Sequence, residues 1–185
     1  MTTAGNFLAR LVSRLTDAGI PSMLTGSFAS TYHGTPRTTH DLDLVVDVSR
    51  ATLRSLLNSM PEDEYYFSQE AAFQALEDKA QFNIIDLASG WKADLIVLKD
   101  REFSRTEFGR RQRGVVLDTP VSIATAEDTI LAKLEWARRG QSERQLRDVA
   151  GILAVSTDLD EAYLDRWVNN LGLRELWQEV RRSSH

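Results

Sequence analysis

The chain of 185 residues contains no cysteine, which excludes disulfides, thiolate metal sites and a cysteine nucleophile. No apolar run approaches the roughly 20 residues that a helix needs to cross a bilayer. The N-terminus also lacks a basic region followed by a long apolar core, the pattern of a secretory signal. We therefore expect no membrane partner and a cytoplasmic location, which suits a chain without cysteine.

The sequence also lacks an excess of positive charge. Its 22 basic and 27 acidic residues give a formal net charge of −5. General, charge-driven binding of nucleic acid needs a basic face, so the composition argues against it, although a local basic groove stays open. Hydrophobic residues make up 42% and charged residues 26%, as in ordinary globular proteins. The length fits one domain, or a domain with a small helical extension.

Hydrophobic periodicity divides the chain into two parts. Strands and helices alternate in the first two-thirds, whereas the last third is helical throughout, so we expect an α+β core over 1–122 and a helical subdomain over 123–185, packed on the core. The expected helices are 6–18, 27–33, 51–60, 69–80, 103–112, 126–139, 142–155, 160–170 and 173–182. The expected strands are 20–25, 38–48, 82–87, 92–98, 115–117 and 121–123, with a hairpin joining 82–87 to 92–98.

Two aspartates, Asp41 and Asp43, stand one residue apart in the apolar run HDLDLVV (40–46). Side chains alternate between the faces of a strand, so both carboxylates point the same way. Two like charges side by side repel, and a divalent cation offsets that repulsion. Carboxylate oxygens suit Mg²⁺, which leaves its other positions to water and phosphates. The alternative is an edge strand with solvated acids, which Leu42, Leu44, Val45 and Val46 make too apolar.

A small-residue turn, Gly26-Ser27, precedes the acidic pair and leads into a short helix. Glycine lets the backbone come close to phosphate oxygens, and the amides at a helix N-terminus bind anions. The alternative is a plain strand-to-helix turn in which Ser27 caps the helix. The acidic pair downstream favours the phosphate site.

Together these features resemble the nucleotidyltransferase superfamily, the fold of the β-type DNA polymerases and of the aminoglycoside and lincosamide nucleotidyltransferases. The resemblance covers residues 20 to about 155. The segments LTGSFA (24–29) and GTPRTTHDLD (34–43) resemble its AbiEii-like and minimal nucleotidyltransferase branch. It implies a mixed sheet flanked by helices, with a helical C-terminal bundle closing the cleft.

The resemblance also implies a third acid on a neighbouring strand, which binds metal with the first pair and accepts the proton of an attacking hydroxyl. Asp94 and Asp86 both lie in apolar strands, where a charge needs a partner. The segment KADLI (92–96) resembles the third-acid strand better, so we predict Asp41, Asp43 and Asp94 as catalytic residues and metal ligands. The alternative for Asp94 is a hairpin acid paired with Lys92.

Two basic residues complete the predicted nucleotide site. In the AbiEii-like branch a lysine in the helix corresponding to 126–139 accompanies the active site, with an Arg-Asp pair further on. Here these are Lys133 and Arg147-Asp148, and Lys133 could contact phosphate as a compact charge. A surface helix with ion pairs is the alternative for Lys133. For Arg37 two interpretations are open: it contacts a phosphate of the nucleotide, or it caps its own loop. We interpret Trp136 as a core or interface residue.

We therefore expect an enzyme that moves a nucleoside monophosphate from an NTP to an acceptor hydroxyl, using Mg²⁺ or Mn²⁺. Gly26, Ser27, Arg37 and Lys133 would bind the nucleotide. The acceptor is an RNA end, a protein or a small molecule. By resemblance the setting is a bacterial toxin–antitoxin or phage-defence system, with a protein partner. The alternative is a catalytically silent regulatory or antitoxin module that keeps the fold and binds a protein.

Overall fold

The structure, a computed structural model, describes residues 3–140 and 142–183. Its helices are α1 (Thr3–Asp17), α2 (Gly26–His33), α3 (Arg50–Asn58), α4 (Gln69–Asp78), α5 (Glu102–Arg110), α6 (Ala126–Gly140), α7 (Glu143–Val155), α8 (Glu161–Asn170) and α9 (Arg174–Ser183). Its strands are β1 (Ser22–Leu24), β2 (Asp41–Val46), β3 (Tyr65–Tyr66), β4 (Gln81–Asp86), β5 (Lys92–Val97), β6 (Gln112–Val116) and β7 (Thr119–Ile123).

The strands form one mixed sheet in the order β3-β4-β5-β2-β1-β7-β6. The hairpin of β4 and β5 is antiparallel, as the sequence predicts. β5 then pairs with β2 in parallel, and β2 pairs with β1 in antiparallel fashion. This order places the strand with the acidic pair at the centre of the sheet, which excludes the edge-strand alternative for Asp41 and Asp43.

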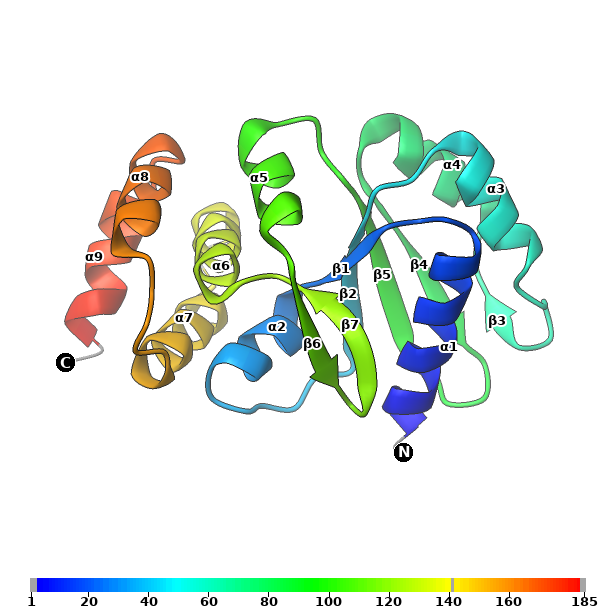
Figure 1. The fold of residues 1–185 in the computed structure, drawn as a ribbon, viewed down its shortest axis with the longest axis horizontal. Helices are drawn as coiled ribbons and strands as arrows, with labels where there is room; N and C mark the ends of the chain where they lie inside the picture. Colours follow the sequence, from blue (N-terminus) through cyan, green and yellow to red (C-terminus); the bar gives the residue numbers. More distant parts are fainter. Residues whose placement is uncertain (1–2, 141, 184–185) are drawn as a thin grey trace.

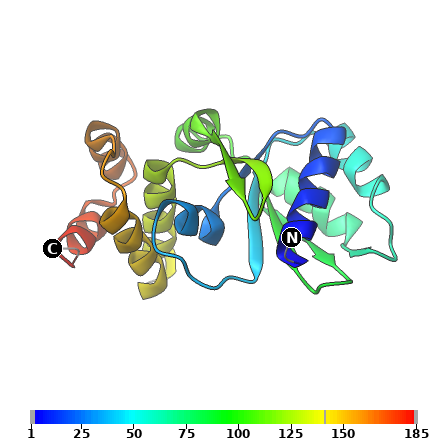
Figure 2. The same ribbon diagram turned by 60° about the horizontal axis from the view of Figure 1, so that its bottom comes forward.

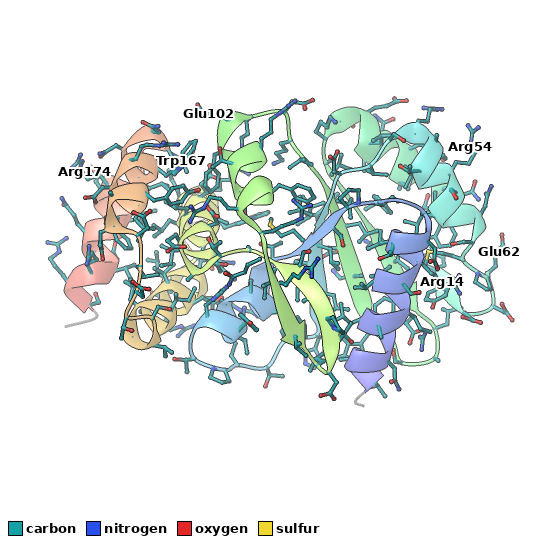
Figure 3. All side chains as sticks on the ribbon, viewed as in Figure 1. Arg14, Arg54, Glu62, Glu102, Trp167 and Arg174 are labelled. Atoms are coloured by element: carbon teal, nitrogen blue, oxygen red, sulfur yellow. The ribbon has the colours of Figure 1, made fainter. Side chains whose placement is uncertain are left out.

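The helices lie at both ends of the sheet (Figure 1). Helices α1, α3 and α4 gather at one end, and α6 to α9 at the other, with α2 between the sheet and the C-terminal helices. Figure 2, turned by 60°, shows the same separation between the N-terminal and C-terminal helices. The labelled residues Arg54 and Glu62 mark one end, and Arg174 marks the other (Figure 3). These observations confirm an α+β fold with a mixed sheet flanked by helices.

Two main hydrophobic clusters follow this arrangement. The first joins the sheet to α1, α2, α3 and α4, and the apolar face of α1 enters it through Phe7, Leu8, Leu11 and Leu15. The second lies within the C-terminal helices and includes Phe103 of α5. Because α5 contributes to the helical cluster, the division at residue 122 stays a prediction.

Local capping explains several helix starts. Ser49 and Thr52 form a capping box at α3, and the Thr125 hydroxyl accepts a hydrogen bond from the amide of Asp128 at the start of α6 (3.2 Å). The short strand β3 is absent from the sequence-based expectations, because two residues carry too little pattern to be recognised. Within residues 3–140 and 142–183, none of the helices combines the length and apolar character needed to cross a bilayer.

Candidate active site

The parallel pairing of β2 and β5 places Asp43 directly opposite Asp94. Neighbouring strands lie about 4.8 Å apart, so the two carboxylates stand side by side on one face of the sheet. Asp94 is 9% exposed. The alternating burial of β2, with even-numbered residues inward, turns Asp41 toward the same face. The sheet therefore brings together acids that are 51 residues apart in the sequence.

The turn before α2 packs directly against Asp43. Gly26 has φ +62, a conformation that favours glycine. A Cβ on Gly26 would lie 2.0 Å from the Asp43 carboxylate oxygen Oδ2, so no larger residue fits here. The backbone amide of Ser27 acts on the Asp43 carboxylate and lowers its pKa, and the N-cap of α2 is Thr25. The alternative in which Ser27 caps the helix is therefore wrong.

Asp43 is in an unfavourable environment for a charge. Its burial, together with the neighbouring Asp94 carboxylate, raises the pKa of Asp43 above the ordinary value. The Ser27 amide and the more distant Lys133 ammonium oppose this shift without cancelling it. A group held at such a cost is typical of a functional site.

Asp41 and Asp94 share a cation of the chain itself. The Lys92 ammonium lies 3.1 Å from Asp94 Oδ2 and 3.6 Å from Asp41 Oδ1. These contacts, the hydrogen bond to Asp94 first, raise the pKa of Lys92. The Asp41 side chain is 51% exposed, at the open end of β2. Lys92 therefore compensates the outer part of the acidic group, while Asp43 has no ion-pair partner among the described residues.

The donor set fits a divalent cation held by two carboxylates. Mg²⁺ takes one or two protein carboxylates and completes its octahedron with water and substrate phosphates, and the Asp43–Asp94 pair matches this requirement. Among residues 3–140 and 142–183, no three His, Cys, Asp or Glu side chains are close enough to hold a metal together. The ligand set of three carboxylates, with Asp41, stays a prediction.

Arg37 and Lys133 meet at a carboxylate rather than standing alone. Lys133 Nζ lies 2.7 Å from Asp148 Oδ2, and Arg37 donates to both oxygens of Asp148 at 2.8 and 3.1 Å. Arg37 also donates to the hydroxyl of Ser27. Burial alone would raise the pKa of Asp148, but hydrogen bonds from Arg37 and Lys133 outweigh it and lower that pKa. The network links the Gly26–Ser27 turn to α6 and α7, and phosphate binding by either cation stays a prediction.

A cleft of about 230 Å³ opens beside these groups. The residues that line it are Thr25, Gly26, Ser27, Asp43, Gln81, Asp94, Ile96, Thr129, Ala132, Lys133, Trp136 and Gln145. Most of the residues expected to bind nucleotide or metal thus face one cavity, between the sheet and helices α6 and α7. Arg37 and Asp41 lie outside this lining, and Arg37 reaches it through Ser27.

Two cleft residues were not anticipated from the sequence. Trp136 is 54% exposed and lines the cleft, so of its two interpretations the core residue is wrong and the interface residue stays a prediction. It stands three residues after Lys133, on the same helical face, and that spacing could have indicated its position. Gln145 Oε1 is buried without a hydrogen-bond partner among the described residues.

Asp86, the rival third acid, has a structural role. Arg10 forms an ion pair with its carboxylate, and the amide and hydroxyl of Ser89 donate to the same group. These contacts close the β4–β5 hairpin and join it to α1. Asp86 is therefore satisfied away from the cleft, and Asp94 is the acid that lies beside Asp43.

Solved structures of low sequence identity share the fold of this chain. The antibiotic-resistance factor ANT(2'')-Ia is 15% identical, with a TM-score of 0.57 over 99% of this chain and 98% of that one. A nucleotidyltransferase-like protein from Paracoccidioides brasiliensis has a TM-score of 0.58 at 15% identity, over 96% and 91% of the two chains. The chain has the nucleotidyltransferase fold.

A third solved structure shares this fold. The lincosamide antibiotic adenylyltransferase LnuA is 9% identical, with a TM-score of 0.56 over 84% of this chain and 99% of that one. No family model and no curated protein matches the sequence. The comparisons thus show the nucleotidyltransferase fold, and the AbiEii-like branch stays a prediction.

Proposed function

We propose that the protein is a Mg²⁺-dependent nucleotidyltransferase that moves a nucleoside monophosphate from an NTP to an acceptor hydroxyl. The observation that carries this proposal is the side-by-side placement of Asp43 and Asp94 next to the Gly26–Ser27 turn, inside one cleft. The neighbours with the same fold include adenylyltransferases, which supports the reaction class.

Each residue of the site would have a distinct role in this reaction. The turn at Gly26 and Ser27 and the Lys133 ammonium would bind the β- and γ-phosphates, and Arg37 would hold the Ser27 hydroxyl toward them. Asp94 would accept the proton of the acceptor hydroxyl as its oxygen attacks the α-phosphorus. A bond forms between that oxygen and phosphorus, the bond to the bridging oxygen of the β-phosphate breaks, and pyrophosphate leaves.

Mg²⁺ held by Asp43 and Asp94, with Asp41 nearby, would stabilise charge on the phosphate oxygens; Mn²⁺ could replace it. Because Asp43 lies beside Asp94 without an ion-pair partner among the described residues, a bound cation would offset the repulsion between the two carboxylates. Release of Asp94 from Lys92 would accompany loading of the site.

The acceptor class is the part of the proposal that the experiment must resolve. Small molecules are included because similar folds occur in antibiotic-modifying proteins, and RNA ends and protein hydroxyls follow from the resemblance to the AbiEii-like branch. A bacterial toxin–antitoxin or phage-defence setting, with a protein partner, belongs to the same proposal.

The test incubates the protein with each α-³²P-labelled NTP, Mg²⁺ or Mn²⁺, and separate RNA, protein and small-molecule fractions of a bacterial extract. We expect label on one fraction, lost with Asp43→Asn or Asp94→Asn. The control is Asp47→Asn, an exposed acid just beyond β2, which should keep wild-type activity. Absence of label in every fraction, with no Mg²⁺-dependent NTP binding, would support the silent regulatory module instead.

A further inference from the structure

The catalytic cleft continues past the carboxylates into a second hollow. The two share Thr25, Ile96, Ala132 and Trp136. Along β5 the hollow follows Ile96 toward Lys99, and along α6 it follows Trp136 toward Arg139. Ile96, which lines both cavities, stands two residues along β5 from Asp94, a spacing of about 6.6 Å. The proposed catalytic, metal-binding and phosphate-binding residues leave this hollow without a role.

The walls of this hollow suit a flat aromatic ring. Val45 and Ile96 turn partly exposed apolar side chains into it from the sheet. Trp136 faces the hollow from α6 with 54% of its surface exposed. A planar heteroaromatic base can bury its apolar faces between such walls. Stacking on an aromatic side chain is possible for every base, because each base has a π-face. The hydroxyl groups of a sugar would find no hydrogen-bond partners on these apolar walls.

The far end of the hollow is polar, and most of its groups are already paired. Arg101 donates to both oxygens of Glu135 at 2.7 and 2.6 Å and to the hydroxyl of Ser104 at 2.8 Å. Glu107 of α5 is 7% exposed and lines the hollow. Within residues 3–140 and 142–183 it has no hydrogen bond or ion pair. Glu107 is therefore a carboxyl group in the wall of the hollow that a bound ligand could contact.

The surroundings of Glu107 determine its protonation. Burial first, and then the Asp128 carboxylate, raise the pKa of Glu107 to about 8, with Glu135 adding to the shift and Arg101 opposing it. Lys99 and Arg139 also line the hollow. At pH 7 the group is therefore a neutral acid, which presents an O–H donor beside a carbonyl acceptor.

We propose that this hollow binds the nucleobase of the NTP, with the ring between Trp136 and the Val45–Ile96 face and its edge read by Glu107, and that it prefers adenine to guanine. The inference rests on the proposed nucleotide transfer. Adenine offers an acceptor at N7 beside a donor at N6, which complements a neutral carboxyl group. Guanine offers two acceptors, N7 and O6, on the same edge, and one of them faces the carbonyl oxygen.

The test measures binding by calorimetry with Mg²⁺ and three probes, namely the α,β-methylene analogues of ATP and GTP, and tripolyphosphate. We expect the ATP analogue to bind about tenfold more tightly than the GTP analogue at pH 7, the effect of about one hydrogen bond. Between pH 7 and pH 9 both analogues should bind more weakly, because Glu107 loses the proton that it donates to N7, an acceptor that the two bases share.

Variants of Glu107 separate base reading from structure. Glu107→Gln keeps a donor beside an acceptor, so it should keep the preference for adenine and remove the pH dependence of binding. Glu107→Leu should bind both analogues equally. The matched control is Glu102→Gln, since Glu102 is exposed at the outer end of the same helix (Figure 3); it should behave as wild type.

Trp136→Ala tests the stacking wall. It should weaken both nucleotide analogues about tenfold or more and leave tripolyphosphate unchanged, whereas Tyr66→Ala, an equally exposed aromatic on β3, should change neither. Equal binding of the two analogues by the wild type, unaffected by Trp136→Ala, would overturn the base site while leaving nucleotide transfer intact. Failure of all three probes to bind would overturn the proposed function as well.

Discussion

At the scale of single residues, the Asp43 carboxylate lowers the stability of the folded chain at the position where the proposed reaction needs it. Its pKa is raised by burial and by Asp94, so the carboxylate ionises more readily in the unfolded chain than in the folded one. Ionised Asp43 therefore destabilises the fold at every pH above the unfolded value of 3.8, and the penalty disappears when both states are protonated. Lys92 compensates Asp94 and Asp41, which leaves Asp43 as the strained member of the group.

This imbalance predicts opposite effects of Asp43→Asn on activity and stability. Transfer activity should fall at least about 100-fold, the usual cost of removing an electrostatic group from a preorganised site. The melting temperature at pH 7 should rise, and the rise should shrink as the pH falls toward 4. Calorimetric scans of both proteins across this range measure the effect. A lower melting temperature for the variant at pH 7 would contradict the electrostatic account.

Gly26 is constrained twice, by its backbone and by its neighbour. Gly26→Ala has to adopt φ +62 and also displace the Asp43 carboxylate. The first effect costs about 1 kcal/mol, and the second adds about 1–3 kcal/mol of overpacking and should abolish transfer activity. Urea denaturation and the labelling assay measure the two effects.

Gly90 supplies the matched control, because it has φ +72 with nothing within 4 Å of its added Cβ. Gly90→Ala should lose only about 1 kcal/mol and keep full activity. Equal losses of stability in the two variants would show that the contact with Asp43 is unimportant.

At the scale of elements, a buried carboxylate joins α5, α6 and α8. Asp128 is fully buried and accepts from Arg110 Nε at 3.1 Å, from the hydroxyl of Thr125 at 2.8 Å and from the hydroxyl of Tyr163. Arg110 also stacks over the Tyr163 ring, 3.8 Å from its centroid. The contact fixes α6, and with it Lys133 and Trp136, against the neighbouring helices.

Removing parts of this junction should cost stability in a graded way. Tyr163→Phe deletes one donor and should lose about 1 kcal/mol. Asp128→Ala leaves Arg110 without its main partner and should lose about 3 kcal/mol or more. Asp165→Ala, an exposed acid on α8, should stay within about 0.5 kcal/mol of wild type. Urea denaturation of the three variants measures the free energy of unfolding. Equal losses for Tyr163→Phe and Asp128→Ala would contradict the proposed role of Asp128 in this junction.

At the scale of the whole molecule, the cleft is formed where the sheet meets the C-terminal helices. The sheet contributes Asp43 and Asp94, and the helices contribute Lys133, Trp136 and Gln145. Each of the two sides has its own hydrophobic cluster. A ligand in the cleft would therefore contact both and hold them together.

Nucleotide binding should accordingly stabilise the complete protein. With Mg²⁺ and an α,β-methylene NTP at 100 times its dissociation constant, the gain should be about 2.7 kcal/mol, visible as a higher melting temperature in a thermal scan. Sodium chloride at the same ionic strength is the control and should give a smaller change. A melting temperature that no NTP analogue moves would contradict the proposed site.

Much of the fold and part of the site could be predicted from local pattern. The alternation of β2 places Asp41 and Asp43 on one face because strand geometry has a period of two. The apolar spacing of Phe7, Leu8 and Leu11 determines the buried face of α1 in the same way. Such features depend on neighbours within a few residues, so the sequence shows them directly.

Long-range register and packing were decided only by the tertiary structure. Asp94 and Asp86 have similar local sequences, and it is the pairing of β5 with β2 that brings Asp94 to Asp43, while Arg10 and Ser89 satisfy Asp86. Likewise, α6 presents Trp136 to the cleft, and α5 places the buried Glu107 in the wall of the adjoining hollow. These outcomes depend on which distant segments share a surface, and the free energy of such contacts is absent from any local window of the chain.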